Sequence, residues 1–135
     1  MTHHNNLLKD LYHALVRIRM IEEEIASAKE NAELADLATR LEKALGEQKA
    51  ATGWFMQNAM ANPNNLGAGA YNYMHIMGIV SLGFMWLKMA KAADAKLAEG
   101  AEDKAFYEAK LVSARYYGER VLPDAGALQI GRAHV

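Results

Sequence analysis

The chain has 135 residues, which suits one domain with a single hydrophobic core. Its 15 Lys and Arg residues nearly balance 16 Asp and Glu residues, giving a net charge of -1, and no segment is strongly basic, so nucleic acid is not an expected partner. Cysteine is absent, which excludes disulfide bonds, thiolate metal sites and a cysteine nucleophile and suits a reducing compartment. The first residues lack the features of a signal peptide, so we expect a cytoplasmic protein.

Apolar residues recur with a period near 3.6 along the chain, which predicts an all-α protein. We expect a first helix from about Asn6 to Lys29, ended by Asn31, and a second from about Ala32 toward Met60. The residues predicted to face the core are Leu8, Leu11, Leu15, Ile18, Ile21 and Ile25 in the first helix, and Leu34, Leu37, Leu41 and Leu45 in the second.

Pro63 and its asparagine neighbours predict a break before the third helix, because proline cannot continue a helix. The third helix is expected over residues 70–98, ended by Gly100 with a positive φ angle. A fourth helix should begin near Glu102 and end or kink at Pro123. Its predicted core residues are Phe106, Ala109, Leu111, Val112, Tyr116 and Val121. Four helices with short connections predict an up-down-up-down four-helix bundle, formed by residues 1–135 as a single helical domain.

The stretch "AYNYMHIMGIVSLGFMWLKMAKAA", residues 70–93, is the most apolar part of the chain. Its unbroken apolar run, residues 76–87, is shorter than the about 20 residues that span a membrane, so we expect a buried helix and no membrane span. Small residues should let another helix approach closely at Gly78, Ser81 and Gly83. Six larger side chains either fill the core, which we favour, or line a pocket for an apolar ligand: Met74, Met77, Met85, Met89, Phe84 and Trp86.

Few residues have the type and spacing of a catalytic or metal-binding site. The three consecutive glutamates at residues 22–24 point about 100° apart on a helix, so we interpret them as a solvated face and not as a carboxylate pair. No Glu-x-x-His motif of a ferritin-like metal site occurs, and His3 with His4 supplies only half of a tetrahedral ligand set. We therefore assign no catalytic, cofactor-binding or metal-binding residue.

His75 lies near two tyrosines, Tyr71 and Tyr73, at the expected start of the third helix. We interpret it as a histidine that hydrogen-bonds a backbone group or a tyrosine, because buried polar groups normally find a partner.

Two segments resemble a known family. "AYNYMHIMGIVSLGFMWLKMAKAADAKL", followed by "FYEAKLVSARYYGERVLPDAGAL", is similar to the C-terminal helical region of acyl-CoA dehydrogenases, in the branch that includes the 3-methylmercaptopropionyl-CoA dehydrogenases. There, an "AYxYMxxxGxVxLGxMW" helix precedes "FYxAKLxxARYYxERVLP". The similarity is dense from about Gly67 to Pro123 and looser back to Leu34, so it covers more than half of the chain.

The resemblance implies an oxidoreductase of fatty acid metabolism, a flavoprotein that oxidises acyl-CoA to enoyl-CoA. Such enzymes use a glutamate to remove the α-proton while hydride passes to FAD. In this branch the glutamate lies in a "YEGT"-like motif, which residues 1–135 do not contain. We therefore expect a structural and oligomerisation domain, a fragment inactive alone, whose partners are the remaining domains of a homo-oligomeric enzyme. A free-standing helical interaction module and a carrier of an apolar ligand are the alternatives.

A domain that packs on the rest of a subunit should expose an apolar patch, and the candidate members are Trp54, Tyr71, Tyr116 and Tyr117. The last six residues, "IGRAHV", resemble the translation of a widely used short-read sequencing adapter. We therefore expect residues 130–135 to be a non-native tail.

Overall fold

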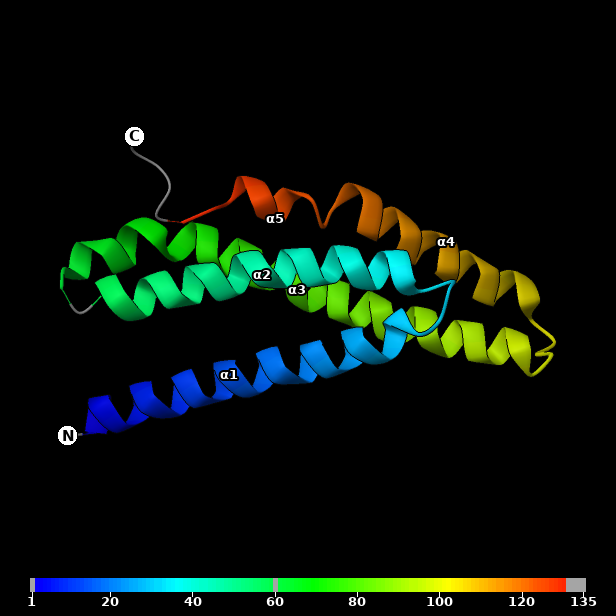
Figure 1. Ribbon diagram of the computed structural model, residues 1–135, viewed down its shortest axis with the longest axis horizontal. Coiled ribbons are helices and arrows are strands. Elements are labelled where there is room, and N and C mark those ends of the chain that lie inside the picture. Colours follow the sequence, from blue (N-terminus) through cyan, green and yellow to red (C-terminus); the bar gives the residue numbers. More distant parts are fainter. Residues whose placement is uncertain (1, 60, 131–135) are drawn as a thin grey trace.

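The computed structural model describes residues 2–59 and 61–130, with the side chains of residues 2–4, 7, 8 and 11 excepted. These residues form helices α1 (Thr2–Lys29), α2 (Ala35–Asn58), α3 (Pro63–Ala98) and α4 (Lys104–Arg120), followed by the short α5 (Asp124–Ala127). The four long helices alternate in direction (Figure 1). The prediction of an all-α, up-down-up-down four-helix bundle is confirmed.

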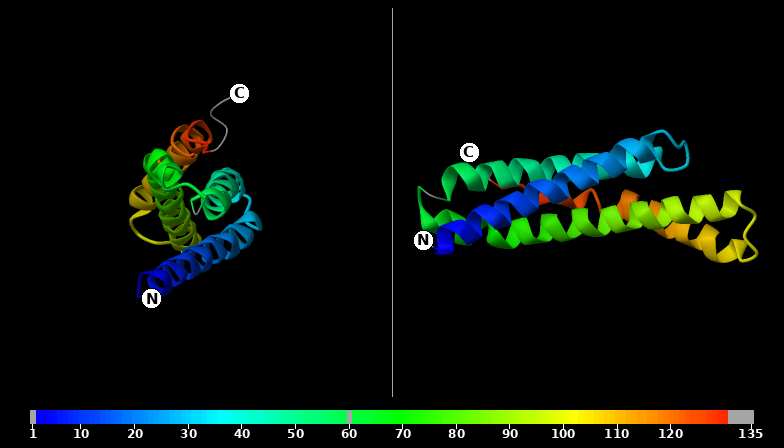
Figure 2. Two further views of the ribbon diagram at one scale, coloured as in Figure 1. Left: turned by 90° about the vertical axis from the view of Figure 1, so that its left-hand side faces the viewer. Right: turned by 90° about the horizontal axis from the view of Figure 1, so that it is seen from below.

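Helices α2 and α3 form the centre of the bundle, because they pack against each other and against both remaining long helices. The end-on view in Figure 2 shows α1 and α4 on opposite sides of this central pair. Helix α5 continues past the end of α4 and packs on α2 and α3. The arrangement leaves one face of α3 without a neighbouring helix, since its partners all lie on the other side.

Helix α3 begins seven residues earlier than predicted. Asn62 has an extended backbone, and its side chain accepts a hydrogen bond from the backbone N–H of Asn64 at 3.0 Å, which caps the helix. Pro63 occupies the first helical position, where its missing N–H costs nothing. The proline thus starts a helix, and the expectation of a loop over residues 63–69 is wrong.

The predicted end of α3 is confirmed. Gly100 has a φ angle of 77°, a left-handed conformation that a side chain would disfavour. The N–H of Gly100 donates to the carbonyl oxygen of Leu97 and the N–H of Ala101 to that of Lys96, each at 3.1 Å. These two bonds form a Schellman motif and satisfy carbonyl groups that the end of the helix leaves free.

The core consists mainly of leucine, isoleucine, valine and alanine. The predicted core residues Ile18, Ile21, Ile25, Leu34, Leu37, Leu41 and Leu45 are all buried. Leu15 is 53 % exposed, because the N-terminal half of α1 lies apart from α2 and α3 (Figure 1). Leu8 and Leu11 belong to the side chains outside the described set.

The core face predicted for α4 is wrong for four of its six residues; Leu111 and Val121 are half-buried and pack against the core. Phe106, Val112 and Tyr116 are 51 %, 63 % and 64 % exposed, and Ala109 is exposed as well. The residues that α4 buries are Ala114, Tyr117 and Gly118. The small residues Ala114 and Gly118 bring α4 close to its neighbours, and Phe106, Val112 and Tyr116 remain outside.

Three helices meet at Gly83. A Cβ atom at this position would lie 2.8 Å from Leu122 Cδ2 and 2.9 Å from Leu41 Cδ1, and both leucines are buried. Beside this point the Tyr117 hydroxyl donates a hydrogen bond to the backbone oxygen of Ile79 at 2.7 Å. The predicted close approach is therefore confirmed at Gly83, where a side chain would require the two leucines to move.

Within the described chain, no other helix approaches Gly78 or Ser81 closely. Both residues are exposed, and a Cβ on Gly78 would meet no atom within 4 Å. They lie on the side of α3 that faces away from the buried residues Ile76, Val80 and Leu87. The apolar pattern is almost continuous around this helix and did not distinguish its two faces.

The start of the expected non-native tail, Ile130, is half-buried and packs against the core. Its Cγ2 atom lies 3.4 Å from the position that a Cβ on Gly69 would take. Residues 131–135 lie outside the described residues. The non-native origin of the tail stays a prediction.

Gly83→Leu should destabilise the fold, because overpacking typically costs about 1–3 kcal/mol and exceeds the about 0.8 kcal/mol that leucine gains in helix propensity. Gly78→Leu, the matched control, should raise the free energy of unfolding by up to about 0.8 kcal/mol, because its side chain enters open space. Urea denaturation in dilute solution measures both. Equal stability of the two variants would contradict the junction at Gly83.

Burial raises the pKa of Tyr117 to about 12, from an ordinary value of 10.0. The unfolded chain loses this proton near pH 10 and the folded chain retains it to higher pH, so the stabilisation is complete below pH 10 and is lost toward pH 12. We expect the free energy of unfolding to fall over this interval and Tyr117→Phe to remove part of the fall. Urea denaturation at a series of pH values checks this, and an unchanged pH dependence in the variant would refute it.

Candidate interaction surface

The glutamates at residues 22–24 do not converge on one point. Glu22 pairs with Lys49 of α2, Glu23 with Arg19 of α1, and Glu24 with Lys91 of α3. The interpretation as a solvated face is confirmed, since each carboxylate is partly exposed and has its own cationic partner. Two of these pairs connect α1 to its neighbours, as does the pair between Lys29 and Glu42. Exposed ion pairs contribute about 0–1 kcal/mol each, and they fix the C-terminal half of α1 against the bundle.

His75 is exposed on α3, and its ring lies 4.3 Å from the ring of Tyr71, one turn earlier. The expected hydrogen bond from His75 to a backbone group or a tyrosine is not formed among the described residues, so that interpretation is wrong. Tyr73 points toward α2, where its hydroxyl lies 2.9 Å from Thr52 Oγ1. The two tyrosines that flank this histidine in sequence therefore have different surroundings.

The apolar side chains of α3 neither fill the core together nor surround one cavity. Met74 and Met85 are 58 % and 50 % exposed, so the expectation that they fill the core is wrong. Met77 and Met89 are half-buried, and Phe84 and Trp86 pack against the edge of the core. Together these side chains extend around the helix, which favours neither a sealed ligand pocket nor a methionine core.

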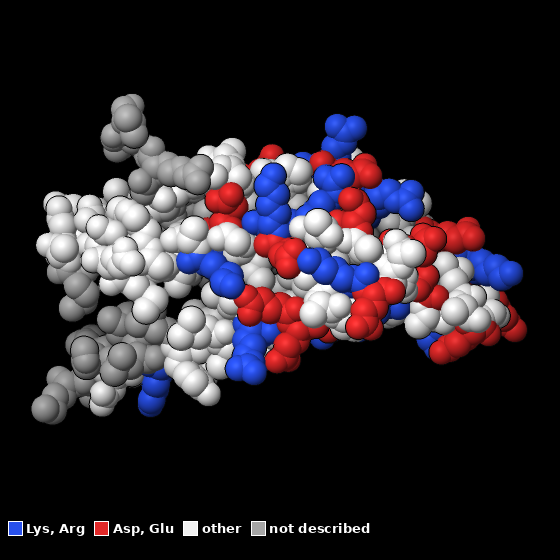
Figure 3. All heavy atoms as spheres, viewed as in Figure 1, with Lys and Arg blue, Asp and Glu red and all other residues white. Residues whose placement is uncertain are grey.

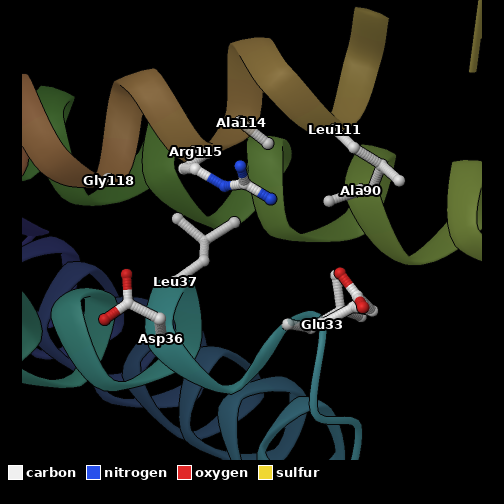
Figure 4. Close-up of a pocket in the computed structure, with 9 residues that line it drawn as sticks. Glu33, Asp36, Leu37, Ala90, Leu111, Ala114, Arg115 and Gly118 are labelled. Carbon is white, nitrogen blue, oxygen red and sulfur yellow. The ribbon is translucent and has the colours of Figure 1, made fainter. Parts of the chain in front are cut away.

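The grooves between helices do not assemble catalytic groups. Figure 4 shows one of them, between the start of α2 and the middle of α4, with Leu37 projecting from α2 toward α4. Glu33 and Asp36 lie on one wall and Arg115 on the other. Asp36 is already paired with Arg40, at 2.8 Å. Within the described part of the chain, no group of three histidine, aspartate or glutamate side chains is placed to hold a metal ion.

Charged residues are unevenly distributed. None occurs between Lys49 and Lys88 in the sequence, a run that forms the end of α2 and most of α3. On the face shown in Figure 3, Lys, Arg, Asp and Glu cover the middle and right of the molecule, and the described residues at the left end are almost all uncharged. A surface without charges is readily dehydrated, which suits contact with another apolar surface.

Large apolar side chains are exposed on this uncharged run. Met56 and Leu66, 53 % and 54 % exposed, lie on either side of the α2–α3 connection, and we call them the uncharged end. Farther along α3, we call Tyr71, Met74, Gly78, Leu82 and Met85 the α3 stripe; its four large side chains are 50–65 % exposed. Exposed apolar residues that gather in this way mark interaction sites.

The four residues predicted to form an exposed apolar patch differ in their exposure. Tyr71 and Tyr116 are exposed as expected, at 65 % and 64 %. Trp54 is half-buried, and Tyr117 is 8 % exposed, so its assignment to the patch is wrong. Tyr117 is turned inward because its position on α4 faces Gly83, where the missing side chain leaves space for the ring.

Helix α3 is long and apolar enough to cross a membrane, by length and composition alone. Its most apolar 18-residue window has a mean hydropathy of 1.4, and 33 % of that window is buried. Core helices have the same properties, and the contacts of α3 with α1, α2 and α4 place it at the centre of the bundle.

A further groove, between α1, α2 and α3, has apolar walls that include Ile21, Met77 and Phe84. Gln48 of α2 lines it and is 6 % exposed. The Oε1 atom of Gln48 is buried without a hydrogen-bond partner among the described residues. A buried amide oxygen without a partner loses its hydration and lowers stability.

Comparison with known proteins gives one family. Residues 17–130 match the family model described as "Acetyl-CoA dehydrogenase C-terminal like", so the match covers the C-terminal part of α1 and all of α2 to α5. A search of curated proteins finds no match.

Gln48→Leu should raise the free energy of unfolding by about 1 kcal/mol, because it removes the unpaired Oε1 and leaves a side chain of similar size among apolar neighbours. Gln48→Glu, the control, should lower it, because a charge is costly to bury. Urea denaturation at neutral pH measures both. A Gln48→Leu variant less stable than the wild type would mean that the amide forms hydrogen bonds the protein needs.

Proposed function

The chain belongs to the acyl-CoA dehydrogenase C-terminal-like family, and we propose that it serves as the C-terminal helical domain of an FAD-dependent enzyme that oxidises acyl-CoA to enoyl-CoA. The observation that carries this proposal is the family match over residues 17–130. The two segments that resemble the 3-methylmercaptopropionyl-CoA dehydrogenase branch fall on α3 and on α4 with α5, which supports that branch for the parent enzyme.

The role proposed for the domain is structural. Several of its carboxylates, such as Glu22 and Glu24, form ion pairs on the surface, and among the described residues no group of three histidine, aspartate or glutamate side chains is placed to hold a metal ion. The uncharged end, by contrast, has the composition of a contact surface. We propose that Met56 and Leu66 pack against the remaining domains of the parent subunit, because burying their apolar surface there is favourable.

The described residues do not fit a flavin site of their own. The long run 50–87 contains no lysine or arginine to neutralise the diphosphate of FAD. The groove in Figure 4 has two carboxylates, Glu33 and Asp36, against a single cation, Arg115, so its charge does not favour that group. We therefore propose that FAD and the catalytic glutamate are supplied by other domains, in a cytoplasmic and homo-oligomeric parent enzyme.

The DNA upstream of this segment provides the first test. We expect it to continue an open reading frame that encodes a flavin-binding region with a "YEGT"-like motif. In the longer protein, charged residues at the uncharged end, Met56→Glu with Leu66→Glu, should weaken the contact between domains. The expected result is loss of bound FAD, read from the flavin absorbance, and lower acyl-CoA oxidation.

Phe106→Glu is the matched control, because Phe106 is 51 % exposed but lies at the opposite end of the bundle, at the start of α4. This variant should retain flavin and activity. Full flavin content in the Met56→Glu/Leu66→Glu protein would exclude the uncharged end as the contact between domains. An upstream sequence that encodes no flavoprotein would instead favour a free-standing interaction module.

A further inference from the structure

The α3 stripe has a symmetrical spacing. Counted from Gly78, its large side chains occur at −7 and −4, which are Tyr71 and Met74, and at +4 and +7, which are Leu82 and Met85. All four are at least half exposed, on the face of α3 opposite its buried residues. Gly78 itself opens onto free space, where a Cβ would meet no atom within 4 Å.

We propose that the α3 stripe is the contact between two copies of this chain, in which two α3 helices cross antiparallel at Gly78. In an antiparallel pair with two-fold symmetry, a residue at −n on one helix lies opposite the residue at +n on the other. Met74 then contacts Leu82 of the second copy, and Tyr71 contacts Met85. The missing side chain at Gly78 lets the two backbones approach closely at the crossing point.

Charge favours a second copy as the occupant of the stripe. A partner surface with charged residues would lose their hydration against α3 without gaining an opposite charge, because residues 50–87 contain none. A second copy of the α3 stripe is itself uncharged, so it can cover the first without dehydrating a charge. Its antiparallel alignment also keeps Lys88, at +10, away from Lys88 of the other copy, since the two lie at opposite ends of the seam.

The area sets the strength of the contact. Four large side chains at half to two-thirds exposure offer roughly 400 Å² per copy, about half of what each partner buries in a stable complex. We therefore expect a weak, concentration-dependent dimer of the 135-residue chain. This inference rests on the proposed function in one respect. The proposed parent enzyme is homo-oligomeric, and the α3 stripe is the surface through which its subunits would meet.

Charge-complementary variants test the pairing, with mass measured by sedimentation equilibrium over a wide concentration range. Met74→Lys alone and Leu82→Glu alone should each weaken dimerisation at least tenfold, because a charge enters an apolar seam. A mixture of the two should dimerise again, since antiparallel pairing brings Lys at 74 against Glu at 82. A wild type that stays monomeric, or a mixture without recovery, would overturn the proposal.

Single cysteines test the direction of the helices, because the chain has no native cysteine. Gly78→Cys should form a disulfide-linked dimer under mild oxidation. Ala92→Cys lies exposed on the same face 14 residues later, so antiparallel pairing separates its two copies by about 40 Å and it should not cross-link. Efficient cross-linking through Ala92→Cys would indicate a parallel pair and refute the antiparallel seam.

Different results would refute the dimer contact and the enzyme assignment. Unfolding followed by circular dichroism should give near wild-type stability for every α3 variant, because each substituted side chain is exposed. Loss of the dimer with an upstream flavoprotein sequence in place would reject only the seam. A dimer that behaves as expected, with no flavoprotein upstream, would reject only the enzyme assignment.

Discussion

The bundle depends on the close contact of three helices at Gly83. Leu41 from α2 and Leu122 from the segment after α4 both reach the space that a side chain on Gly83 would occupy. Tyr117 adds a hydrogen bond from α4 to the backbone of α3 at the same level. Because all three helices are fixed there, the junction determines which face of α3 is buried and which face, with Gly78 at its centre, remains outside.

Electrostatics divides the molecule into two parts. In the charged part, ion pairs such as Lys91 with Glu24 connect α1 to the bundle and supplement the apolar core. In the uncharged part, α1 lies apart, and apolar side chains of α2 and α3 are exposed (Figures 1 and 3). Since exposed apolar surface is unfavourable in water, the second part has the physical character of a surface that is completed by contact with another protein surface.

This division fits a domain whose contribution to an enzyme is assembly. The charged half contains the packed core, the helix caps at Asp103 and Gly100, and ion pairs such as that of Glu24 with Lys91. The uncharged half has two separate exposed apolar surfaces, the uncharged end, which we propose contacts other domains, and the α3 stripe, which we propose contacts a second copy. Under the proposed function, catalysis depends on groups in other domains, which the bundle supports through these contacts.

The sequence by itself determined the number and direction of the long helices, because a 3.6-residue apolar period and strong breakers such as Gly100 act locally. It also indicated the family, through motifs now placed on α3 and α4. It did not determine which face of α3 or α4 is buried, since Met74, Met85, Val112 and Tyr116 are as apolar as the residues that form the core. Only the tertiary structure decided this, because burial follows from where helices can approach most closely, and that depends on small residues such as Gly83, Ala114 and Gly118 meeting leucines distant in the sequence.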